Sequence, residues 1–386
     1  MKTYAEINEK IRQGKAVVFT AEEIIKVVKE KGYQTAAKEV DVVTTATFGP
    51  MCSSGAFLNF GHSDPPIRMA KVWLNDVPAY AGIAAVDAYI GATELSETKN
   101  FAYGGAHVIE ALVRGEKVHL KATSYGTDCY PRKDIQTLVG LKDLNQAYLF
   151  NPRNAYQNYS VAVNSSNRTI YTYMGTLLPN FGNATYSTAG ELSPLLNDPY
   201  YRTIGIGTRI FLGGGVGYVA WEGTQHNPGQ NRDSNGIPTA SAGTLALIGD
   251  LKQMKSEFLR AALFERYGVS MYLGVGIPIP ILDEAILRQT AVSNREIRAT
   301  VVDYSVPKRS KPNFGQVSYE ELRSGSITIN DKKISTAPLS SLYHARQIAG
   351  ILKEWINNGH FCLTEPVQAL PKESSVKPLE ISEGEV

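Results

Sequence analysis

Residues 42–55 read Val42-Val43-Thr44-Thr45-Ala46-Thr47-Phe48-Gly49-Pro50-Met51-Cys52-Ser53-Ser54-Gly55. The β-branched first half of this stretch favours a strand, and the glycine, proline and serine residues of the second half favour a turn. A similar change occurs between residues 118–124 and 125–131, and Cys129 lies in the second of these segments. The sequence therefore places Cys52 and Cys129 where a strand passes into a loop, which is where α/β proteins tend to present reactive groups.

Helical and strand patterns alternate along the rest of the chain. Apolar residues at helical spacing predict helices, and β-branched runs on either side of a short polar or glycine-rich turn predict hairpins. The predicted helices cover residues 4–11, 20–31, 106–114, 250–267 and 341–358, the predicted hairpins cover 160–173, 206–221 and 327–334, and residues 271–282 are expected to form a buried strand and turn.

These patterns predict an α/β fold, with a mixed α+β arrangement as the alternative. We expect residues 1–366 to form a single large catalytic unit of one or two lobes, with a mixed sheet, glycine-rich loops at the strand ends and flanking helices. Residues 367–386 are polar and contain acidic residues and prolines, which predicts a disordered tail.

The composition excludes several classes of protein. Of the 386 residues, 43% are hydrophobic and 20% are charged, and the net charge of +2 predicts no binding to nucleic acid or to an anionic membrane. Three cysteines are too few for a disulfide framework. The sequence contains neither a signal peptide nor an apolar run of about 20 residues. We therefore expect a cytoplasmic protein.

The three cysteines have different surroundings in the sequence. Cys52 is followed by two serines that could cap a helix, and a helix N-terminus would favour the reactive thiolate. The other interpretation of Cys52 is a small buried residue beside a turn. Cys362 lies between Phe361 and Leu363, the ordinary setting of a cysteine in a hydrophobic core.

Charged residues adjoin Cys129 in the sequence. Arg132 and Lys133 would lower the pKa of its thiol, whereas Asp128 would raise it or serve as an acid or base. These neighbours slightly favour a functional role for Cys129 over a packing role.

Two further segments are rich in functional groups. Residues 61–68 contain His62, Asp64 and Arg68, and an arginine is suited to a bidentate grip on a substrate carboxylate. Residues 221–229 contain Glu222, Thr224, Gln225 and His226 behind a glycine-rich turn. A solvated loop is the alternative for both segments. No zinc-ligand spacing, nucleotide-binding loop or Gly-x-Ser-x-Gly motif is present.

Nearly the whole chain resembles the homocysteine-biosynthesis (HcyBio) family. The segments that carry the resemblance are long and irregular, so that chance similarity is a poor explanation for them. They are residues 49–55, 61–66, 125–133, 144–147, 151–157, 192–199, 223–228 and 363–367.

The resemblance implies a sulfurtransferase of anaerobes that converts L-aspartate semialdehyde to L-homocysteine, for methionine biosynthesis. It also implies a ferredoxin-like iron–sulfur protein as electron donor, and it makes Cys52 and Cys129 the two important cysteines. Many relatives carry a C-terminal pair of CBS regulatory domains, and we expect none here because the sequence ends soon after Val367.

A mechanism follows from this resemblance as a hypothesis. One thiolate carries sulfur as a persulfide, or sulfide enters directly, and sulfur replaces the aldehyde oxygen as water is lost. Closing a disulfide between Cys52 and Cys129 would supply two electrons, which requires their Cα atoms to come within about 7 Å.

Other polar residues receive roles in this hypothesis. Proton transfer is assigned to His226, His62 or Asp128, and the substrate carboxylate to Arg68 or Arg132. The remaining candidates for substrate binding are Asp64, Glu222, Thr224 and Gln225.

Two other functions stay open at this point. The chain could carry an iron–sulfur cluster on Cys52, Cys129 and Cys362, or it could be a non-catalytic ligand-binding subunit of a sulfur-transfer complex. No cofactor is firmly predicted, because the cluster is expected on the partner protein. We also expect a homo-oligomer.

Overall fold

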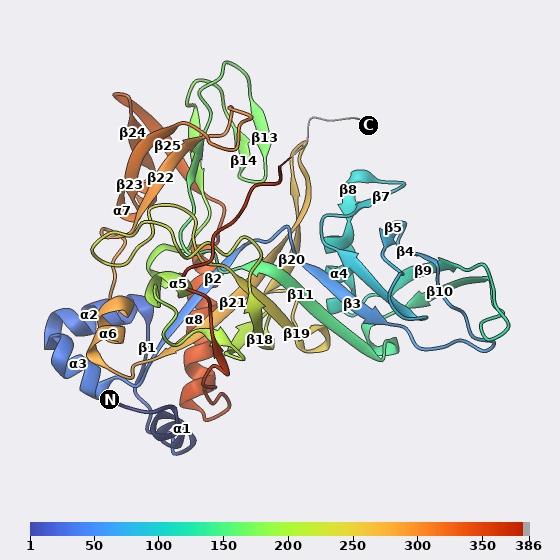
Figure 1. Cartoon of the computed structure of the whole chain (residues 1–386), viewed down its shortest axis with the longest axis horizontal. Helices are drawn as coiled ribbons and strands as arrows, with labels where there is room; N and C mark the ends of the chain where they lie inside the picture. The colour runs from blue at the N-terminus through green and yellow to red at the C-terminus, as the bar shows by residue number, and fades with distance from the viewer. Residues whose placement is uncertain (381–386) are drawn as a thin grey trace.

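The computed structural model describes residues 1–380 and has a mixed α/β fold built around one large sheet (Figure 1). The strand order in this sheet is β1-β2-β21-β17-β18-β19-β11-β3-β6, and β20 also pairs with β21. The bounds are β1 Val18–Thr20, β2 Val42–Pro50, β3 Gly55–Asn59, β6 Asp87–Gly91, β11 Gln146–Asn154, β17 Arg209–Leu212, β18 Gly215–Glu222, β19 Leu245–Asp250, β20 Leu259–Phe264 and β21 Gly268–Pro280.

Strand β2, which the stretch at residues 42–50 predicts, lies at the centre of the fold. It pairs with β21 in antiparallel register from Val42 opposite Pro280 to Pro50 opposite Tyr272. Helix α8 (Leu342–Asn357) covers both strands, and the hydroxyl of Thr44 donates to the Ala349 carbonyl oxygen at 2.9 Å. Helix α8 covers one face of this strand pair, and other segments of the protein cover the opposite face. Almost every residue of β2 is therefore buried.

Three helices open the chain, α1 (Tyr4–Arg12), α2 (Ala21–Lys31) and α3 (Tyr33–Glu39). The hydroxyls of Thr3 and Thr20 accept from the backbone N–H groups of Glu6 and Glu23, and each glutamate carboxylate accepts from the threonine N–H in return. These reciprocal bonds satisfy N–H groups that a helix start would otherwise leave unpaired, and the helices predicted over residues 4–11 and 20–31 are confirmed.

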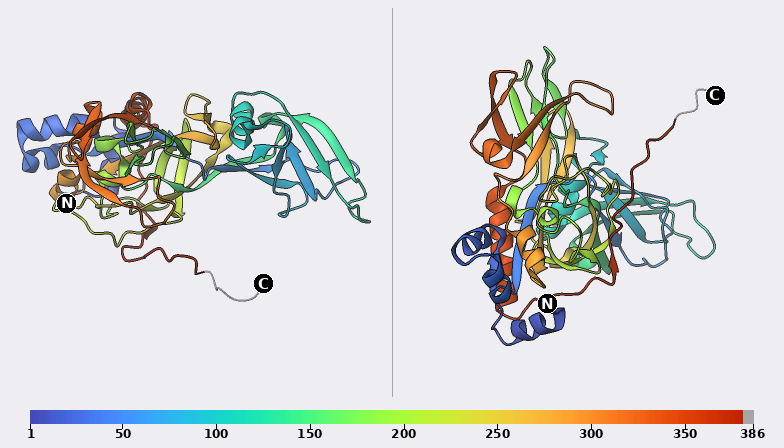
Figure 2. Two further views of the ribbon diagram at one scale, coloured as in Figure 1. Left: turned by 90° about the horizontal axis from the view of Figure 1, so that it is seen from above. Right: turned by 60° about the vertical axis from the view of Figure 1, so that its left-hand side comes forward.

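A four-stranded sheet forms an arm that projects from the large sheet on the side opposite α1–α3 (Figures 1 and 2). Its order is β10-β9-β4-β5, and the loop that contains Cys129 joins β9 to β10. Helix α4 and the hairpin β7–β8 lie between the arm and the large sheet. The bounds are β4 Lys71–Leu74, β5 Val77–Ala79, β7 Leu95–Ser96, β8 Asn100–Gly104, α4 Gly105–Val113, β9 Val118–Thr123 and β10 Asp134–Val139.

A six-stranded sheet forms a second lobe with its own hydrophobic core. Its order is β23-β22-β12-β15-β25-β24, and it contains both parallel and antiparallel pairs. The bounds are β12 Val161–Val163, β15 Asn183–Tyr186, β22 Arg298–Asp303, β23 Asn313–Ser318, α7 Tyr319–Arg323, β24 Ser326–Ile329 and β25 Lys332–Pro338, and the separate hairpin is β13 Ile170–Thr172 with β14 Gly175–Leu177. The remaining short elements are η1 Leu141–Asp143, η2 Gly190–Leu192, α5 Pro194–Asn197, β16 Gly205–Ile206, η3 Leu251–Gln253, α6 Glu284–Thr290 and β26 Gln368–Ala369.

The helix predicted over residues 250–267 is wrong. This segment forms the short helix η3 and strand β20, which pairs with residues 268–273 of β21. Strand β21 extends beyond the reach of β17, and β20 supplies hydrogen bonds to that extension. Pairing between distant strands therefore overrides an apolar spacing that is compatible with either structure.

The hairpin predicted over residues 160–173 is also wrong, because β12 pairs with β15 and β22 while β13 pairs with β14. The hairpins β17–β18 and β24–β25 and helices α4 and α8 confirm the corresponding predictions. No helix begins at Cys52, because residues 51–54 form a tight turn that leads into β3.

The segment predicted to be a disordered tail begins with the short strand β26, which pairs with β16. Leu370 is buried, and the carbonyl oxygen of Pro371 lies 3.0 Å from a ring nitrogen of His226. Residues 381–386 of that predicted tail lie outside the described part of the chain. Among residues 1–380, no helix is both long and apolar enough to cross a membrane.

Replacing Gly350 with alanine is expected to stabilise the protein by about 0.5–1 kcal/mol, because glycine is the poorer helix former. Gly350 lies inside α8, and no atom approaches within 4 Å of the position that a Cβ would occupy. By contrast, Gly274→Ala in β21 should destabilise the protein, since its Cβ would lie 2.7 Å from Ile348 Cδ1 and 3.2 Å from Phe258 Cβ, and both side chains are held in the core. Thermal unfolding of both variants checks the prediction, and a lower midpoint for Gly350→Ala would contradict it.

Asp41 is expected to stabilise the fold at neutral pH and to lose this effect in acid. Burial alone would raise the pKa of its carboxyl, but Lys10 at 2.7 Å, the Val17 N–H at 3.0 Å and Lys2 at 3.2 Å outweigh burial and lower that pKa. A depressed folded-state pKa gives stability that is present above the unfolded value near 3.9 and is lost as the pH falls through the folded value.

Asp41→Asn should therefore cost about 1.5–3 kcal/mol at pH 7, the range for hydrogen bonds to charged groups. The difference from the wild type should shrink as the pH falls below about 4. Unfolding midpoints measured from pH 7 to pH 3 test this, and a difference that stays constant over that range would refute the assignment.

Candidate functional site

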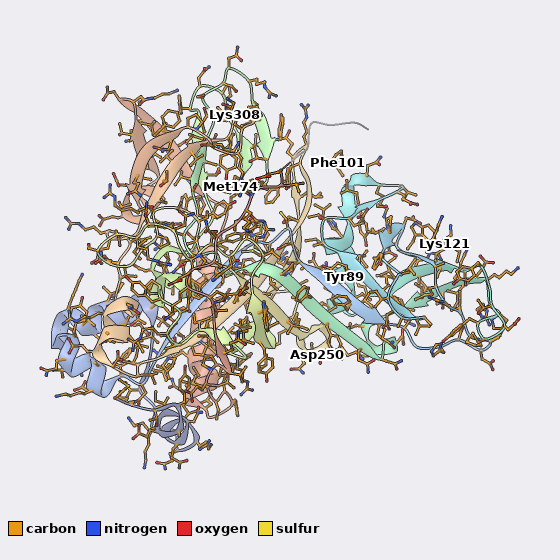
Figure 3. All side chains as sticks on the ribbon, in the orientation of Figure 1. Tyr89, Phe101, Lys121, Met174, Asp250 and Lys308 are labelled. Carbon is orange, nitrogen blue, oxygen red and sulfur yellow. The ribbon has the colours of Figure 1, made fainter. Side chains whose placement is uncertain are left out.

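A cavity of about 620 Å³ opens where the large sheet, the hairpin β13–β14 and the β20–β21 turn meet. Met174, which lines it, lies between the second lobe and the large sheet (Figure 3). The volume falls in the usual range of small-molecule sites. The polar side chains that line it include Cys52, Arg153, Tyr156, Tyr173, Thr188 and Tyr267.

Cys52 reaches the cavity from the turn between β2 and β3, and this turn is fastened to β11. The hydroxyl of Ser53 lies 3.2 Å from Asn151 Oδ1 and 3.1 Å from the carbonyl oxygen of Arg153. The Asn151 amide donates to the hydroxyl of Ser54 at 2.7 Å. The two serines after Cys52 thus hold the turn in place rather than cap a helix.

The Cys52 thiol is half-buried and has two hydroxyl neighbours. Its sulfur lies 3.1 Å from Ser270 Oγ. Burial, together with the adjacent Cys52 thiol, raises the pKa of Tyr267 to about 12. The Tyr267 phenol therefore stays protonated at neutral pH and can donate a hydrogen bond to a sulfur anion at Cys52.

Tyr159 and Tyr173 form another part of the wall, and their hydroxyls belong to a chain that includes Tyr304, which is not a lining residue. The Tyr159 and Tyr304 hydroxyls each lie 3.1 Å from the Tyr173 hydroxyl. Burial, together with the neighbouring phenols, raises the pKa values of Tyr159 and Tyr304. These hydroxyls are therefore neutral, and the wall can exchange hydrogen bonds with a ligand without adding charge.

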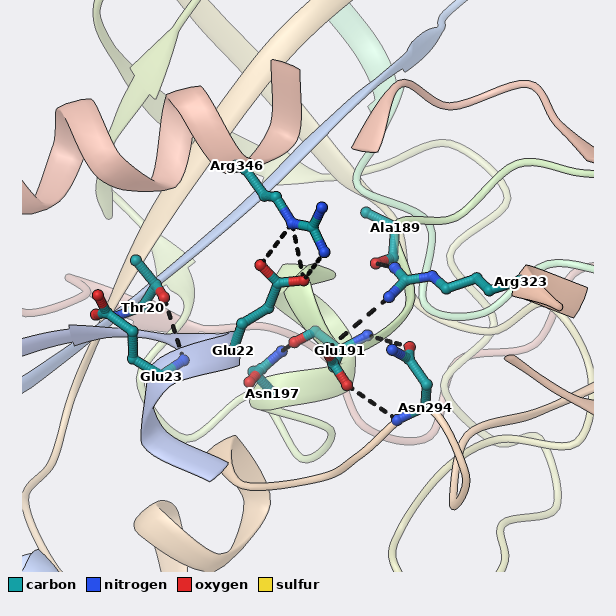
Figure 4. A network of polar contacts seen from close by, with 9 residues as sticks. All are labelled: Thr20, Glu22, Glu23, Ala189, Glu191, Asn197, Asn294, Arg323 and Arg346. Carbon is teal, nitrogen blue, oxygen red and sulfur yellow. Dashed lines mark hydrogen bonds and ion pairs between the residues drawn. The ribbon is translucent and has the colours of Figure 1, made fainter. Parts of the chain in front are cut away.

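Residues 187–194 form the wall nearest α2 and α8, and a buried polar network fixes this segment (Figure 4). Glu191 exchanges hydrogen bonds of 3.1 Å with Asn294, and its carboxylate lies 3.9 Å from Arg323. Burial raises the pKa of Glu191. Arg323 of α7 also donates to the Ala189 carbonyl oxygen at 2.6 Å, so these contacts tie the cavity wall to α7. A separate, exposed ion pair joins Arg346 of α8 to Glu22 of α2 at 2.8 Å.

Thr188, in this wall, has a hydroxyl without a hydrogen-bond partner among the described residues. The residue is only 7% exposed and lines the cavity. The hydroxyl oxygen itself is fully buried, so it is an unpaired polar group inside the wall and costs the fold free energy.

Cys129 and Asp128 lie on the exposed loop of the arm and do not line the cavity. The nearest polar group to the Cys129 sulfur that the structure shows is the Thr127 hydroxyl, at 3.5 Å. In this arrangement Cys129 is not a neighbour of Cys52, and all three cysteines are free thiols.

Several residues predicted to bind substrate gather beside that loop instead of at the cavity. Arg132 donates to the carbonyl oxygens of Asp64 at 2.6 Å and Pro65 at 3.0 Å. The His62 ring stacks on Tyr130 at 5.9 Å. Arg68 follows Ile67, which pairs with Arg132. The arm therefore brings His62, Asp64, Arg68 and Arg132 close to Cys129 and leaves all of them outside the cavity lining.

One residue of the segment 221–229 contacts a side chain that lines the cavity. The candidates in this segment are Glu222, Thr224, Gln225 and His226. The Thr224 hydroxyl accepts from Arg153 Nε at 3.0 Å. His226 is buried, with Nδ1 accepting from the Thr244 N–H and Nε2 donating to the Pro371 carbonyl, each at 3.0 Å. Both ring nitrogens thus have backbone partners, and His226, Glu222 and Gln225 do not line the cavity.

Cys362 packs against the main hydrophobic core, as the sequence predicts. Within residues 1–380, no group of three His, Cys, Asp or Glu side chains lies close enough together to hold a metal ion. The arrangement within one chain therefore does not fit a cluster bound by Cys52, Cys129 and Cys362.

Four residues that line the cavity do not stand out in the sequence: Arg153, Tyr156, Thr188 and Tyr267. Arg153 and Tyr156 fall in residues 151–157, which enter the sequence analysis only through the family resemblance. Ala155 has a φ of 49°, a rare conformation for alanine that often marks a functional segment. The sequence carries no sign of that backbone conformation.

A mixed α/β protein with a thiol, a guanidinium and several phenols facing one cavity has the features of an enzyme. The family model described as "Homocysteine biosynthesis enzyme, sulfur-incorporation" matches residues 16–363. This chain belongs to that family, as its sequence motifs indicate.

Relatives with curated descriptions support the same assignment. The chain is 55% identical over 378 residues to the L-aspartate semialdehyde sulfurtransferase of Methanosarcina acetivorans, a match that spans 98% of this chain and 74% of the relative. It is 52% identical to the L-aspartate semialdehyde sulfurtransferase of Methanocaldococcus jannaschii, over 98% of this chain and 75% of the relative. No solved structure matches significantly. The chain is therefore an enzyme of homocysteine biosynthesis that incorporates sulfur.

Proposed function

We propose that this enzyme converts L-aspartate semialdehyde to L-homocysteine and that Cys52 handles the incoming sulfur. The observation that carries the proposal is the position of Cys52, whose thiol opens into the cavity beside Ser270 and Tyr267. The substrate in this proposal is taken from the names of the two relatives described above, which are both L-aspartate semialdehyde sulfurtransferases. A non-catalytic ligand-binding subunit would not require a thiol in this place.

The overall reaction sets what the site must do. With sulfide as donor, R–CHO + H₂S + 2H⁺ + 2e⁻ gives R–CH₂–SH + H₂O. Sulfur adds to the aldehyde carbon, the carbonyl oxygen takes up protons and leaves as water, and the resulting C=S group accepts two electrons. If the sulfur arrives as a Cys52 persulfide, two more electrons are needed to break the S–S bond.

The residues around Cys52 match these steps. Attack on the aldehyde carbon generates a negatively charged oxygen on the substrate. The protonated Tyr267 phenol lies next to the Cys52 sulfur, where it can stabilise this oxygen and donate a proton to it. Ser270, at 3.1 Å from the sulfur, orients the thiol by a hydrogen bond. The neutral tyrosine wall admits a charged amino acid without competing for its charges.

We propose Cys129 as the second redox thiol, and a ferredoxin-like iron–sulfur protein as the source of electrons. The exposed loop of the arm leaves Cys129 open to a protein reductant. A disulfide between Cys52 and Cys129 requires their Cα atoms to lie within about 7 Å. The loop that contains Cys129 must therefore reach the mouth of a cavity. It can reach the cavity of the same chain if the arm moves, or the cavity of a second copy of the chain.

An anaerobic assay with aspartate semialdehyde, sulfide and a low-potential reductant tests the proposal, with homocysteine as the product measured. Intact mass of the protein after turnover reports a disulfide between Cys52 and Cys129, and intact mass after exposure to polysulfide, which carries sulfur at the zero-valent level, reports a persulfide on Cys52. Folded wild-type protein that makes no homocysteine under these conditions would overturn the proposal. Full activity of Cys129→Ala with sulfide and the physiological reductant would remove the role given to Cys129.

A further inference from the structure

We infer that Arg153 binds the α-carboxylate of the amino-acid substrate inside the cavity that contains Cys52. This inference rests on the proposed function, because it requires a substrate with a carboxylate at one end and an aldehyde at the other. It replaces Arg68 and Arg132, which the sequence suggests for this role.

A β-bulge directs Arg153 toward the cavity. In the pairing of β11 with β19, Asn151 lies opposite Leu247 and Asn154 lies opposite Leu245, so β11 contains one extra residue between these pairs. An extra residue bends a strand and changes the direction of its side chains, and such bulges are common beside active sites. The bulge lifts Pro152 and Arg153 out of the regular ladder.

The conformation of this segment is held by several bonds. The Arg153 N–H donates to Asn151 Oδ1 at 2.9 Å, and the Thr224 N–H donates to the Pro152 carbonyl at 2.8 Å. Ala155 continues the segment with its positive φ of 49°. A strained conformation that several contacts maintain is typical of a segment with a functional role.

The guanidinium of Arg153 is oriented but not neutralised. Its Nε donates to the Thr224 hydroxyl at 3.0 Å, and its charge acts on the Tyr156 phenol, where it opposes the rise in pKa that burial causes. Among the described residues, no carboxylate forms an ion pair with Arg153. The guanidinium also hydrogen-bonds the Tyr156 phenol, and its N–H groups beyond those bonded to Thr224 and Tyr156 are available for a ligand. A carboxylate is the group that matches them in shape and charge.

The turn that contains Cys52 and the bulge that contains Arg153 are in direct contact. Ser53, next to Cys52, is bonded to the carbonyl oxygen of Arg153, and the Tyr156 phenol is influenced by both the Arg153 guanidinium and the Cys52 thiol. The aldehyde and the carboxylate of the substrate would thus meet groups on two segments that are hydrogen-bonded to each other.

The two alternative arginines are less well placed. The Arg132 guanidinium already donates to two backbone carbonyls of the arm, and neither Arg132 nor Arg68 lines the cavity. A carboxylate held by them would leave the aldehyde away from the Cys52 thiol.

Binding of L-homoserine, measured by calorimetry, tests the inference without turnover. L-Homoserine has the carboxylate and ammonium of the substrate with a hydroxyl in place of the aldehyde, and 3-aminopropan-1-ol is the same molecule without the carboxylate. Arg153→Gln should weaken L-homoserine binding about 10- to 100-fold, the range for one charge-assisted interaction, and should leave 3-aminopropan-1-ol binding unchanged. Arg295→Gln, an exposed arginine away from the cavity, is the matched control.

Three results would overturn the inference: L-homoserine binding to the wild type that is no tighter than that of 3-aminopropan-1-ol, an Arg153→Gln variant that binds both as the wild type does, or a variant that loses both equally. If Arg153 positions the carboxylate, Arg153→Lys should restore part of the lost affinity, and Thr224→Val should raise KM for aspartate semialdehyde more than it lowers kcat. Because binding does not depend on sulfur transfer, failure of the proposed function in the homocysteine assay remains a separate result.

Discussion

Cys52→Ser is expected to reduce homocysteine formation by at least about 1000-fold, because a serine hydroxyl neither carries sulfur nor ionises near neutral pH. The fold should survive, since the hydroxyl is smaller than the thiol and can keep the contact with Ser270. The anaerobic assay measures the loss, and thermal unfolding shows whether the variant is folded.

Cys362→Ala is the matched control for this prediction. Cys362 packs on the hydrophobic core away from the cavity, so its removal should cost some stability but little activity. Substantial activity in a folded Cys52→Ser variant would contradict the role of Cys52, and equal loss of activity in both variants would indicate that the cysteines act through the fold.

Gly105→Ala is expected to be the most damaging of the glycine substitutions, with a loss of about 3 kcal/mol or more in the free energy of unfolding. A Cβ at this position would lie 1.8 Å from the carbonyl oxygen of Gly91, a backbone atom that has no rotamer to change. Gly105 begins α4 and donates its N–H to Glu94 at 2.8 Å. Displacing this contact would move the adjoining residues Thr93 and Leu95, which line the cavity.

Gly91→Ala provides a matched control for this steric prediction. Gly91 is the other glycine of the same contact, yet a Cβ there would meet no atom within 4 Å. Thermal unfolding should therefore show a large fall in the midpoint for Gly105→Ala and a small change for Gly91→Ala. Similar midpoints for the two variants would refute the steric argument.

The parts of the fold that follow from sequence are those with a strong local signal. Thr3 and Thr20 mark helix starts because the capping bonds form between residues three apart, and β2 is recognisable because its β-branched run is uninterrupted. Residues 250–267 could not be assigned in this way. Their apolar spacing fits a helix, and only the need of β21 for a partner, set by the rest of the sheet, makes them a strand.

The same distinction between local and long-range signals applies to the residues of the candidate site. Cys52 can be predicted from its place after a strand, because the strand and the turn are both local. Arg153 enters the cavity through a bulge between β11 and β19, and Thr188 through a loop fixed by Glu191 and its partners. Those positions depend on residues about 100 apart in the chain, so no pattern within residues 151–157 or 187–194 reveals them.

The pairing of β2 with β21 has a consequence for synthesis of the protein. The strand that presents Cys52 is complete after 50 residues, but its antiparallel partner ends at Pro280, and the Ser341 N–H donates to the Phe48 carbonyl at 2.8 Å. Contacts of such long sequence separation form late, and a chain emerging from the ribosome lacks them. The thiol therefore acquires its hydroxyl neighbours only when most of the polypeptide has been translated, so that unfinished chains present an ordinary cysteine rather than the site proposed for sulfur transfer.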